Sequence, residues 1–267
     1  MIYLKTRDEI ELIRESCLLV SKTLALVAKN IQPGITTKEL GQKAEAFIKK
    51  NGGYPAFLGY EGFPNTLCIS VNDEVVHGIP SAYKIREGDI ISVDCGVKKN
   101  GFYGDACYTF LVMNVSDEKK RLCNITREAL FKGIKEAVEG NRVGAIGNAV
   151  QKHAEKAGFS VVREMVGHGI GKNLHEEPEV RNYGKRWRGK KLVAGMVIAI
   201  EPMINAGGRK IYRSDDGWTI KTEDGKPAAH YEHTVAVGFE KAEILSNFDI
   251  IEKEINKNRF LWQNSLQ

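Results

Sequence analysis

Apolar residues recur at every third or fourth position in several long segments of the chain, which is the spacing of an amphipathic helix. The first segment covers residues 6–29 and places on one stripe Ile10, Ile13, Cys17, Val20, Leu24 and Val27. The same spacing predicts helices over residues 36–50, 117–139 and 143–157. Ser116 is the expected N-cap of the helix over residues 117–139. After residue 241 the chain is polar with scattered apolar residues, and we assign this part no role.

A β-hairpin is predicted between the first pair of helices and the second. Two apolar runs, residues 90–98 and 102–112, flank the dipeptide Asn100-Gly101. Asn-Gly between such runs is the strongest short-range signal for a hairpin with a two-residue type I′ turn.

The register of this hairpin brings two carboxylates together. Asp94 is expected to face Cys107, and Gly96 to face Asp105 and leave open space opposite it. Because residues two apart on a strand share a face, Asp94 and Asp105 are diagonal neighbours with Cβ atoms roughly 7 Å apart or less. Two like charges on a buried sheet face repel each other, and a bound divalent cation would remove the repulsion. The alternative is that both acids face solvent on an edge hairpin.

The chain also contains a faint internal repeat. Residues 88–96 and 195–203 each read glycine, five mostly apolar residues and a carboxylate, which is Asp94 in the first half and Glu201 in the second. Each block follows a predicted helix that ends at a glycine, at an interval of 36 positions in the first half and 37 in the second. We therefore expect a duplicated α+β unit with pseudo-two-fold symmetry and both carboxylates at its centre. The predicted organisation is one domain over residues 1–267, with halves of about 1–115 and 116–245 and a polar tail of about 246–267.

Three residues with metal-binding chemistry lie in the second half. His168 stands among glycines after an apolar run, Glu201 ends an apolar strand, and Glu232 lies in residues 231–237, which alternate like a strand. Each signal is weak alone, since a lone histidine is more often structural than a ligand. Together with the two hairpin acids they make a set of four carboxylates and one imidazole, which suits Mn, Fe, Co or Zn.

Other features of the sequence narrow the classes of function. It contains no His-Glu-x-x-His or Gly-x-Ser-x-Gly motif, and its five cysteines include no Cys-x-x-Cys pair. No apolar stretch approaches the ~20 residues of a membrane span, and the first residues lack the features of a signal peptide, so we expect a cytoplasmic protein without membrane contact. The net charge is +5, and residues 181–191 carry six basic side chains. This loop is either a solvated surface or a transient contact with RNA phosphates, such as those of the ribosome.

These residues, in this order, resemble the type I methionine aminopeptidases of the pita-bread fold. The resemblance covers roughly residues 3–245 and rests on the blocks 67–80, 88–94, 101–105, 167–171, 200–203 and 231–234. It implies an α+β pita-bread (creatinase/aminopeptidase) fold with two pseudo-symmetric halves, a central antiparallel sheet and helices on its outer face. It also implies an enzyme that removes the N-terminal methionine from nascent polypeptides whose second residue is small. We expect this enzyme to be a monomer.

The resemblance further implies a role for each candidate residue. Two divalent metal ions would be held by Asp94, Asp105, His168, Glu201 and Glu232, with Asp105 and Glu232 bridging both. Among the catalytic residues, His77 would contact the scissile amide and His175 would help to stabilise the tetrahedral intermediate. Glu201 or Glu232 would carry a proton to the leaving amine. The substrate-binding residues would be His77 and His175 together with the methionine pocket, which is Tyr60, Phe63, Cys68 and Trp218.

Two alternatives stay open at this point. A prolidase-like peptidase of the same fold would use the same ligand set, and peptides that begin Met-Ala-Ser or Gly-Pro would separate the two activities. A metal-free member of the fold would only bind protein or RNA. The presence of all five ligand types argues against this second alternative.

Overall fold

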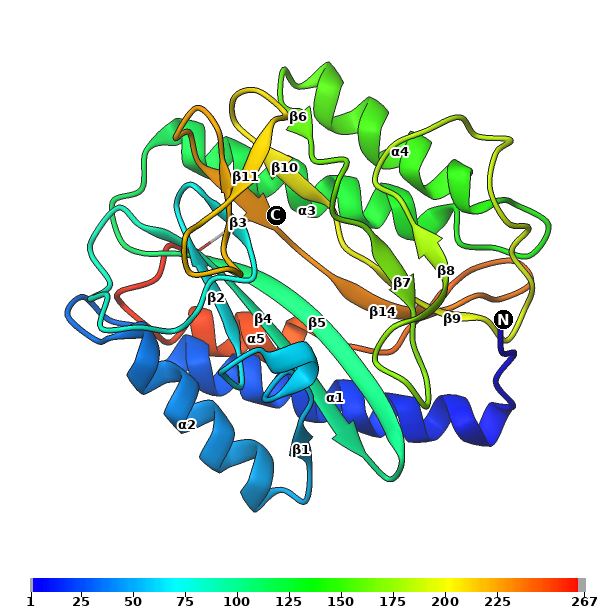
Figure 1. Cartoon of the computed structure of the whole chain (residues 1–267), viewed down its shortest axis with the longest axis horizontal. Helices are drawn as coiled ribbons and strands as arrows, with labels where there is room; N and C mark the ends of the chain where they lie inside the picture. The colour runs from blue at the N-terminus through cyan, green and yellow to red at the C-terminus, as the bar shows by residue number, and fades with distance from the viewer. Residues whose placement is uncertain (1, 264–267) are drawn as a thin grey trace.

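The computed structural model describes residues 2–263 (Figure 1). The helices expected from the apolar spacing are present as α1 (Arg7–Asn30), α2 (Thr37–Lys50), α3 (Asp117–Lys135) and α4 (Val143–Lys156). The hydroxyls of Thr6, Thr36 and Ser116 each accept a backbone N–H from the first turn of α1, α2 and α3. These caps satisfy donors that a helix start leaves unpaired, which is why the three helices begin where the sequence predicts.

The prediction for α3 was wrong at its C-terminal end, because the helix stops at Lys135 rather than at residue 139. Val138 instead forms a parallel bridge with Gly238, and Gly140 follows with a φ of +88°. A pairing with a segment far away in the sequence therefore competes with the last helical turn. No local signal in the sequence marks that competition.

Each half contributes an antiparallel sheet. In the first half, β4 (Ile90–Lys99) pairs with β5 (Phe102–Leu111) and also with β1 (Tyr54–Pro55) and β2 (Cys68–Val71). The second sheet has the order β15 (Glu243–Ile244), β14 (His233–Ala236), β9 (Val197–Ile200), β7 (Gly167–Gly169) and β8 (Glu176–Val180). Two smaller sheets flank them: β13 (Ala228–His230), β10 (Met203–Asn205) and β6 (Ser160–Val161), and β11 (Ile211–Arg213), β12 (Ile220–Thr222) and β3 (Glu74–Val76).

The β4–β5 hairpin has the predicted turn and register. Asn100 and Gly101 have φ angles of +50° and +83°, as the two central residues of a type I′ turn require. Asp94 faces Cys107 and Gly96 faces Asp105. The expectation of open space at Gly96 was wrong, because a Cβ there would lie 2.6 Å from the ring of Phe57. The glycine makes room for an aromatic ring, which the loop after β1 supplies.

The two halves meet where β5 lies beside β14. The backbone N–H of Asp105 donates to the hydroxyl of Thr234 (3.2 Å), and that hydroxyl donates to the carbonyl of Asp105 (2.8 Å). The N–H of Glu232 donates to the carbonyl of Cys107 (2.9 Å). Two predicted metal ligands are thus held by their own backbones at the seam between the halves.

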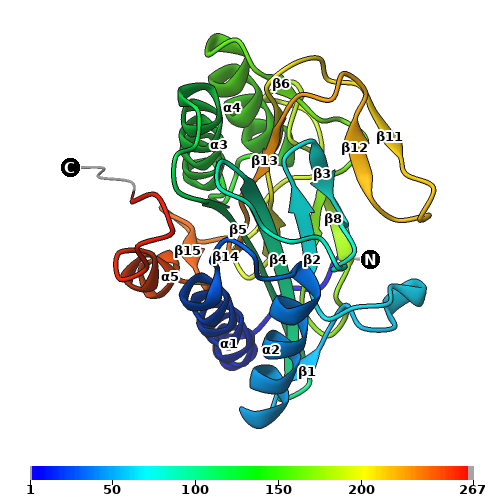
Figure 2. The same ribbon diagram turned by 90° about the vertical axis from the view of Figure 1, so that its left-hand side faces the viewer.

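Helices cover one side of this sheet assembly. Figure 2 shows α1, α3 and α4 on one side, with β8, β11 and β12 on the other. α1 approaches β5 so closely that a Cβ at Gly104 would lie 2.5 Å from the backbone nitrogen of Cys17. Among the helices of residues 2–263, none has the length and apolar character that crossing a membrane would need.

The predicted polar tail contains a helix that the sequence did not reveal, α5 (Phe248–Ile255). Its buried side chains are Phe248, Ile251 and Ile255, and Phe248 stacks on the ring of His233 with centroids 3.7 Å apart. Asn258 then donates to carbonyls at the end of α1. The segment therefore covers apolar surface of α1 and the second sheet, although an eight-residue helix is too short for a clear periodic signal. Residues 264–267 of the predicted tail lie outside the described residues.

Candidate active site

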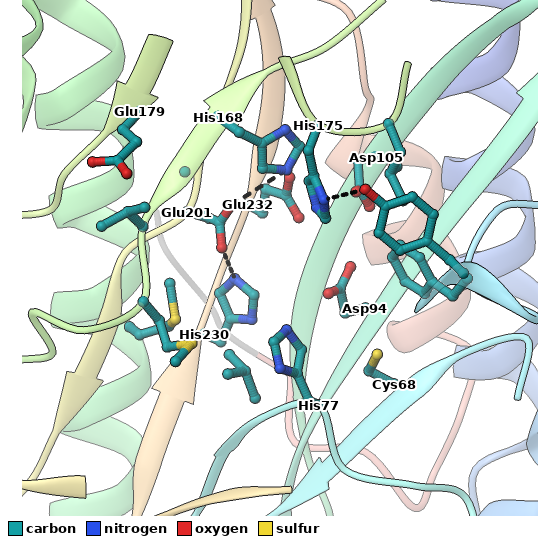
Figure 3. A pocket seen from close by; sticks show the side chains of 18 of the residues that line it. Cys68, His77, Asp94, Asp105, His168, His175, Glu179, Glu201, His230 and Glu232 are labelled. Atoms are coloured by element: carbon teal, nitrogen blue, oxygen red, sulfur yellow. Dashed lines mark hydrogen bonds and ion pairs between the residues drawn. The ribbon is translucent and has the colours of Figure 1, made fainter. Parts of the chain in front are cut away.

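A cavity of about 550 Å³ lies between the two halves, and residues of both halves line it (Figure 3). All five predicted metal ligands line this cavity: Asp94, Asp105, His168, Glu201 and Glu232. Asp94 and Asp105 come from β4 and β5, and His168 from β7. Glu201 follows β9 and Glu232 precedes β14, so every ligand lies on a strand or directly beside one. The structure brings together the set that the sequence had scattered over more than half of its length.

The ligand atoms lie close to one another. Three residues, Asp105, His168 and Glu232, each offer one ligand atom, and these atoms lie within 4.8 Å of one another. Nε2 of His168 is 3.6 Å from Oε1 of Glu201. The other ring nitrogen of His168, Nδ1, is 2.9 Å from the carbonyl of Gly169. A carbonyl only accepts, so Nδ1 carries the proton and Nε2 presents a lone pair to the cavity, as a metal-binding imidazole must.

Burial shifts the pKa of every acid in this cluster upward. Desolvation raises the pKa of Asp94 to about 7, and desolvation with mutual repulsion holds the pKa values of Asp105, Glu201 and Glu232 well above their usual range. Desolvation lowers the pKa of His168 to about 3, so this imidazole is neutral near pH 7. A cluster of this kind carries a large unfavourable energy when its acids ionise without a counter-charge.

The residues present fit a bound divalent cation. Oδ1 of Asp94, Oδ1 of Asp105 and Oε1 of Glu232 are buried, and within residues 2–263 they have no hydrogen-bond partner. Buried carboxylate oxygens are costly when unpaired, and a metal ion would satisfy them and neutralise their charge. Oxygen ligands with one neutral imidazole are the donor set that Mn, Fe, Co or Zn accepts.

The two predicted catalytic histidines face the cluster from opposite sides of the cavity (Figure 3). His77 has a φ of +60°, and desolvation lowers its pKa to about 4. Nδ1 of His175 is 2.9 Å from the hydroxyl of Tyr60, and the His175 ring meets that of His168 edge-on with centroids 4.3 Å apart. Desolvation also lowers the pKa of His175. Both rings are therefore neutral hydrogen-bonding groups at pH 7.

The apolar part of the cavity contains most of the predicted methionine pocket. Tyr60, Phe63 and Cys68 line it, and Cys68 lies on β2 directly beside Asp94. Trp218 is not among the lining residues. Its ring packs edge-on against those of Phe63 (5.2 Å) and His77 (6.4 Å), so it supports the wall from behind.

His230 is a cavity residue that the sequence analysis missed. It is 2% exposed, its Nε2 has no hydrogen-bond partner in the described part of the chain, and that atom lies 3.8 Å from Oε2 of Glu201. Desolvation lowers its pKa to about 3. The sequence offered one signal for His230. It stands two residues before Glu232, and side chains two apart on a strand share a face.

Comparison with known proteins agrees with this geometry. Residues 11–238 match the metallopeptidase family M24. The chain belongs to metallopeptidase family M24. It is 52% identical over 246 residues to the methionine aminopeptidase of Clostridium perfringens, covering 92% of this chain and 99% of that protein. It is 50% identical over 237 residues to methionine aminopeptidase 1 of Bacillus subtilis, covering 89% of this chain and 96% of that protein.

Solved structures also show that the chain has the fold of the M24 family. The methionine aminopeptidase of Thermotoga maritima superposes with a TM-score of 0.91 at 42% identity, over 92% of this chain and all of that one. The prolidase of Pyrococcus horikoshii has a TM-score of 0.76 at 23% identity, over 91% of this chain and 63% of that one, and so shares the fold. The predicted pita-bread fold and the resemblance to type I methionine aminopeptidases are confirmed. As a member of M24 the protein is a metal-dependent hydrolase, so the metal-free alternative is not favoured.

Proposed function

We propose that the protein is a methionine aminopeptidase that removes the N-terminal methionine from nascent polypeptides whose second residue is small. The observation that carries the proposal is the convergence of Asp105, His168 and Glu232 on one point of a cavity that also has an apolar pocket. A peptide end fits such a cavity, with its side chain against the apolar wall and its first peptide bond beside the ligands.

We assign two divalent metal ions to the five ligands. Asp94 would hold one ion, His168 and Glu201 the other, and Asp105 and Glu232 would bridge both. When bound, such a pair supplies a water that ionises near neutral pH and a positive charge that polarises the scissile carbonyl. Five protein ligands and three unpaired carboxylate oxygens support this assignment.

The histidines and one acid would do the remaining work. His77 would bind the scissile amide. If the Tyr60 hydroxyl donates to Nδ1 of His175, then Nε2 carries the proton and donates to the oxygen of the tetrahedral intermediate. Glu201, whose carboxylate lies in the cavity 3.6 Å from Nε2 of His168 and 3.8 Å from Nε2 of His230, would carry a proton to the leaving amine.

The apolar wall would select the side chain that is removed. Tyr60, Phe63 and Cys68 offer two rings and a thiol, which suit a flexible thioether. Trp218 would hold the Phe63 ring in place. The side chain removed would be that of methionine, because an unbranched, flexible thioether adapts well to apolar surroundings.

One assay tests the proposed activity. Metal-stripped protein is supplied with Mn, Fe, Co or Zn in turn and given Met-Ala-Ser or Gly-Pro peptides. We expect release of free methionine with at least one metal and no cleavage of Gly-Pro. Cleavage of Gly-Pro without methionine release would identify a prolidase-like enzyme instead.

The basic loop between residues 181 and 191 would act as a transient ribosome contact. Arg181, Lys185, Arg188 and Lys190 border a groove of about 460 Å³, which shares Glu177 and Glu179 with the main cavity. Phosphate contacts of this kind weaken steeply with salt. Co-sedimentation with ribosomes at low and high salt, with Arg188→Ala/Lys190→Ala as the comparison, measures this contact.

The remaining assignments concern the whole chain. We propose a single catalytic domain of two halves, residues 1–115 and 116–245, that acts as a monomer. One chain supplies all five ligands, so the site needs no second copy. We also propose that it works in the cytoplasm, where nascent polypeptides emerge. Size-exclusion chromatography with light scattering and cell fractionation test these assignments.

A further inference from the structure

The N-terminal segment reaches the loop that carries His175. Lys5 lies just before α1, and its backbone N–H donates to the carbonyl of Gly195 (2.8 Å), at the turn that precedes β9. Figure 1 shows this end of the chain beside β8 and β9. The segment is therefore attached to the strand that leads to Glu201, and it lies next to the hairpin formed by β7 and β8.

Lys5 forms a buried ion pair with that hairpin. Its Nζ lies 2.6 Å from Oε2 of Glu176, and the two side chains are 5% and 3% exposed. Nζ also donates to the carbonyl of Tyr3 (3.0 Å), and Oε1 of Glu176 accepts the N–H of Asn173 (3.1 Å). Both charged groups thus have further hydrogen bonds, which is what a buried ion pair needs to offset desolvation.

The ion pair of Lys5 and Glu176 packs against the backbone of the loop between His168 and His175. A Cβ at Gly171 would lie 2.5 Å from Cε of Lys5 and 2.8 Å from Oε1 of Glu176, so the pair packs directly on this glycine. The carbonyl of Gly171 accepts the N–H of Tyr103 on β5 (2.8 Å). The loop is held between the N-terminal segment and the strand that carries Asp105.

The position of Glu176 connects this packing of the ion pair to the reaction. Glu176 opens β8, pairs with Gly169 on β7, and directly follows His175. The Glu176 carboxylate binds Lys5 and the N–H of Asn173, while the ring of the preceding residue, His175, contacts Tyr60 and His168 in the cavity. Gly169 and Glu176 are the sequence neighbours of His168 and His175. Their pairing therefore sets where the His175 ring contacts His168 and Tyr60.

We propose that Lys5 is a positioning residue for His175: its ion pair with Glu176 holds the loop so that the imidazole faces the reacting carbonyl. The inference rests on the proposed function, because it assumes that His175 stabilises the tetrahedral intermediate. It assigns a role in turnover to a residue that lies outside the cavity and has no contact with substrate.

Kinetics of three variants test the proposal: Lys5→Met, Glu176→Gln and the two combined. Turnover of Met-Ala-Ser is measured at saturating Mn²⁺, together with the melting temperature. We expect Lys5→Met to lower kcat by about tenfold or more with little change in KM, since small misplacements of a catalytic group are costly. The combined variant leaves no unpaired buried charge, so its melting temperature should recover while kcat stays low. Wild-type kcat in the combined variant would show that the pair only stabilises the fold.

Lys172→Met is the matched control. Lys172 belongs to the same loop and pairs with Glu9 (3.2 Å), but its side chain is 69% exposed. An exposed ion pair contributes little, so kcat should not change. A loss equal to that of Lys5→Met would attribute the effect to loop charge in general and overturn the proposal.

A double-mutant cycle with His175→Ala separates this inference from the proposed function. If Lys5 acts through His175, Lys5→Met should cause no further loss of kcat in the His175→Ala background. Independent, multiplying losses would overturn the positioning role. Wild-type kcat in His175→Ala alone would instead overturn the assignment of His175 in the proposed function.

Discussion

Nε2 of His168, on β7, and Oε1 of Glu201, directly after β9, lie 3.6 Å apart. β7 and β9 pair at Gly169 and Ile198, which places the two side chains side by side. Nδ1 of His168 is committed to the Gly169 carbonyl, so a lone pair of the imidazole faces the carboxylate oxygen of Glu201. Such a contact is unfavourable between an ionised carboxylate and a neutral ring unless a cation lies beside both.

Loss of a ligand should therefore remove activity without unfolding the protein. We expect His168→Ala or Asp94→Ala to lower Met-Ala-Ser turnover by about 100-fold or more, because even indirect supports of a metal ligand are worth 10- to 100-fold. Metal content by atomic absorption should fall in parallel, while circular dichroism stays unchanged. Glu118→Gln, an exposed acid on α3, serves as the control and should keep full activity. Full activity in His168→Ala would refute the site.

Removal of metal should make stability depend on the ionisation of Asp94. Its pKa is raised from 3.8 to about 7 in the fold, so its neutral form is favoured there and stability is lost as pH rises from about 4 to 7. In metal-free protein at pH 8, Asp94→Asn should increase the free energy of unfolding by up to about 4 kcal/mol, since each pKa unit corresponds to about 1.4 kcal/mol. At pH 4 the variant and the wild type should be alike. Thermal melts in EDTA at both pH values measure the difference, and an equal gain at both would contradict the ionisation mechanism.

The Tyr60 hydroxyl should matter through its bond to His175. Tyr60→Phe keeps the ring in the apolar wall but removes the partner of Nδ1, so the imidazole loses its fixed tautomer and orientation. We expect kcat to fall about tenfold with little change in KM, as for other partners that orient a catalytic imidazole. Tyr54→Phe, on an exposed ring, is the control. The reverse pattern, a higher KM at constant kcat, would indicate that Tyr60 only binds substrate.

Gly96 should tolerate no side chain. A Cβ would lie 2.6 Å from the Phe57 ring and 3.0 Å from Cβ of Ala56, so Gly96→Ala must displace a wall of the cavity. The expected cost is about 1–3 kcal/mol of stability, the range for overpacking, with a raised KM for methionine peptides. At Gly208 the nearest atom would be 3.6 Å away, so Gly208→Ala should be neutral in chemical denaturation. Equal stability of the two variants would contradict this packing.

The sequence predicted those structural features that depend on residues close together along the chain. Apolar spacing located α1 to α4, with Ser116 as the predicted cap of α3, and Asn100-Gly101 set the register of the hairpin that pairs Asp94 with Cys107. A two-residue turn leaves one register, so this part of the site followed from local geometry. The roles of the five ligands came from family resemblance, because spacing along a chain does not say which distant residues meet.

Long-range contacts decided the rest. α3 ends early because Val138 pairs with Gly238. α5 forms because it packs against α1 and because its Phe248 stacks on His233. His230 belongs to the cavity, and Trp218 stands behind its wall, for reasons of packing between segments far apart in the sequence. The ion pair of Lys5 and Glu176 has the same origin.

The chain by itself thus determined where its first four helices begin, its central hairpin and the kinds of chemistry it carries, since these depend on dihedral preferences, apolar periodicity and side-chain type within a few residues. Only the tertiary structure decided which groups share the cavity and which of them are buried without partners. Burial and proximity set the charge of a carboxylate or an imidazole, and both are properties of the assembled fold.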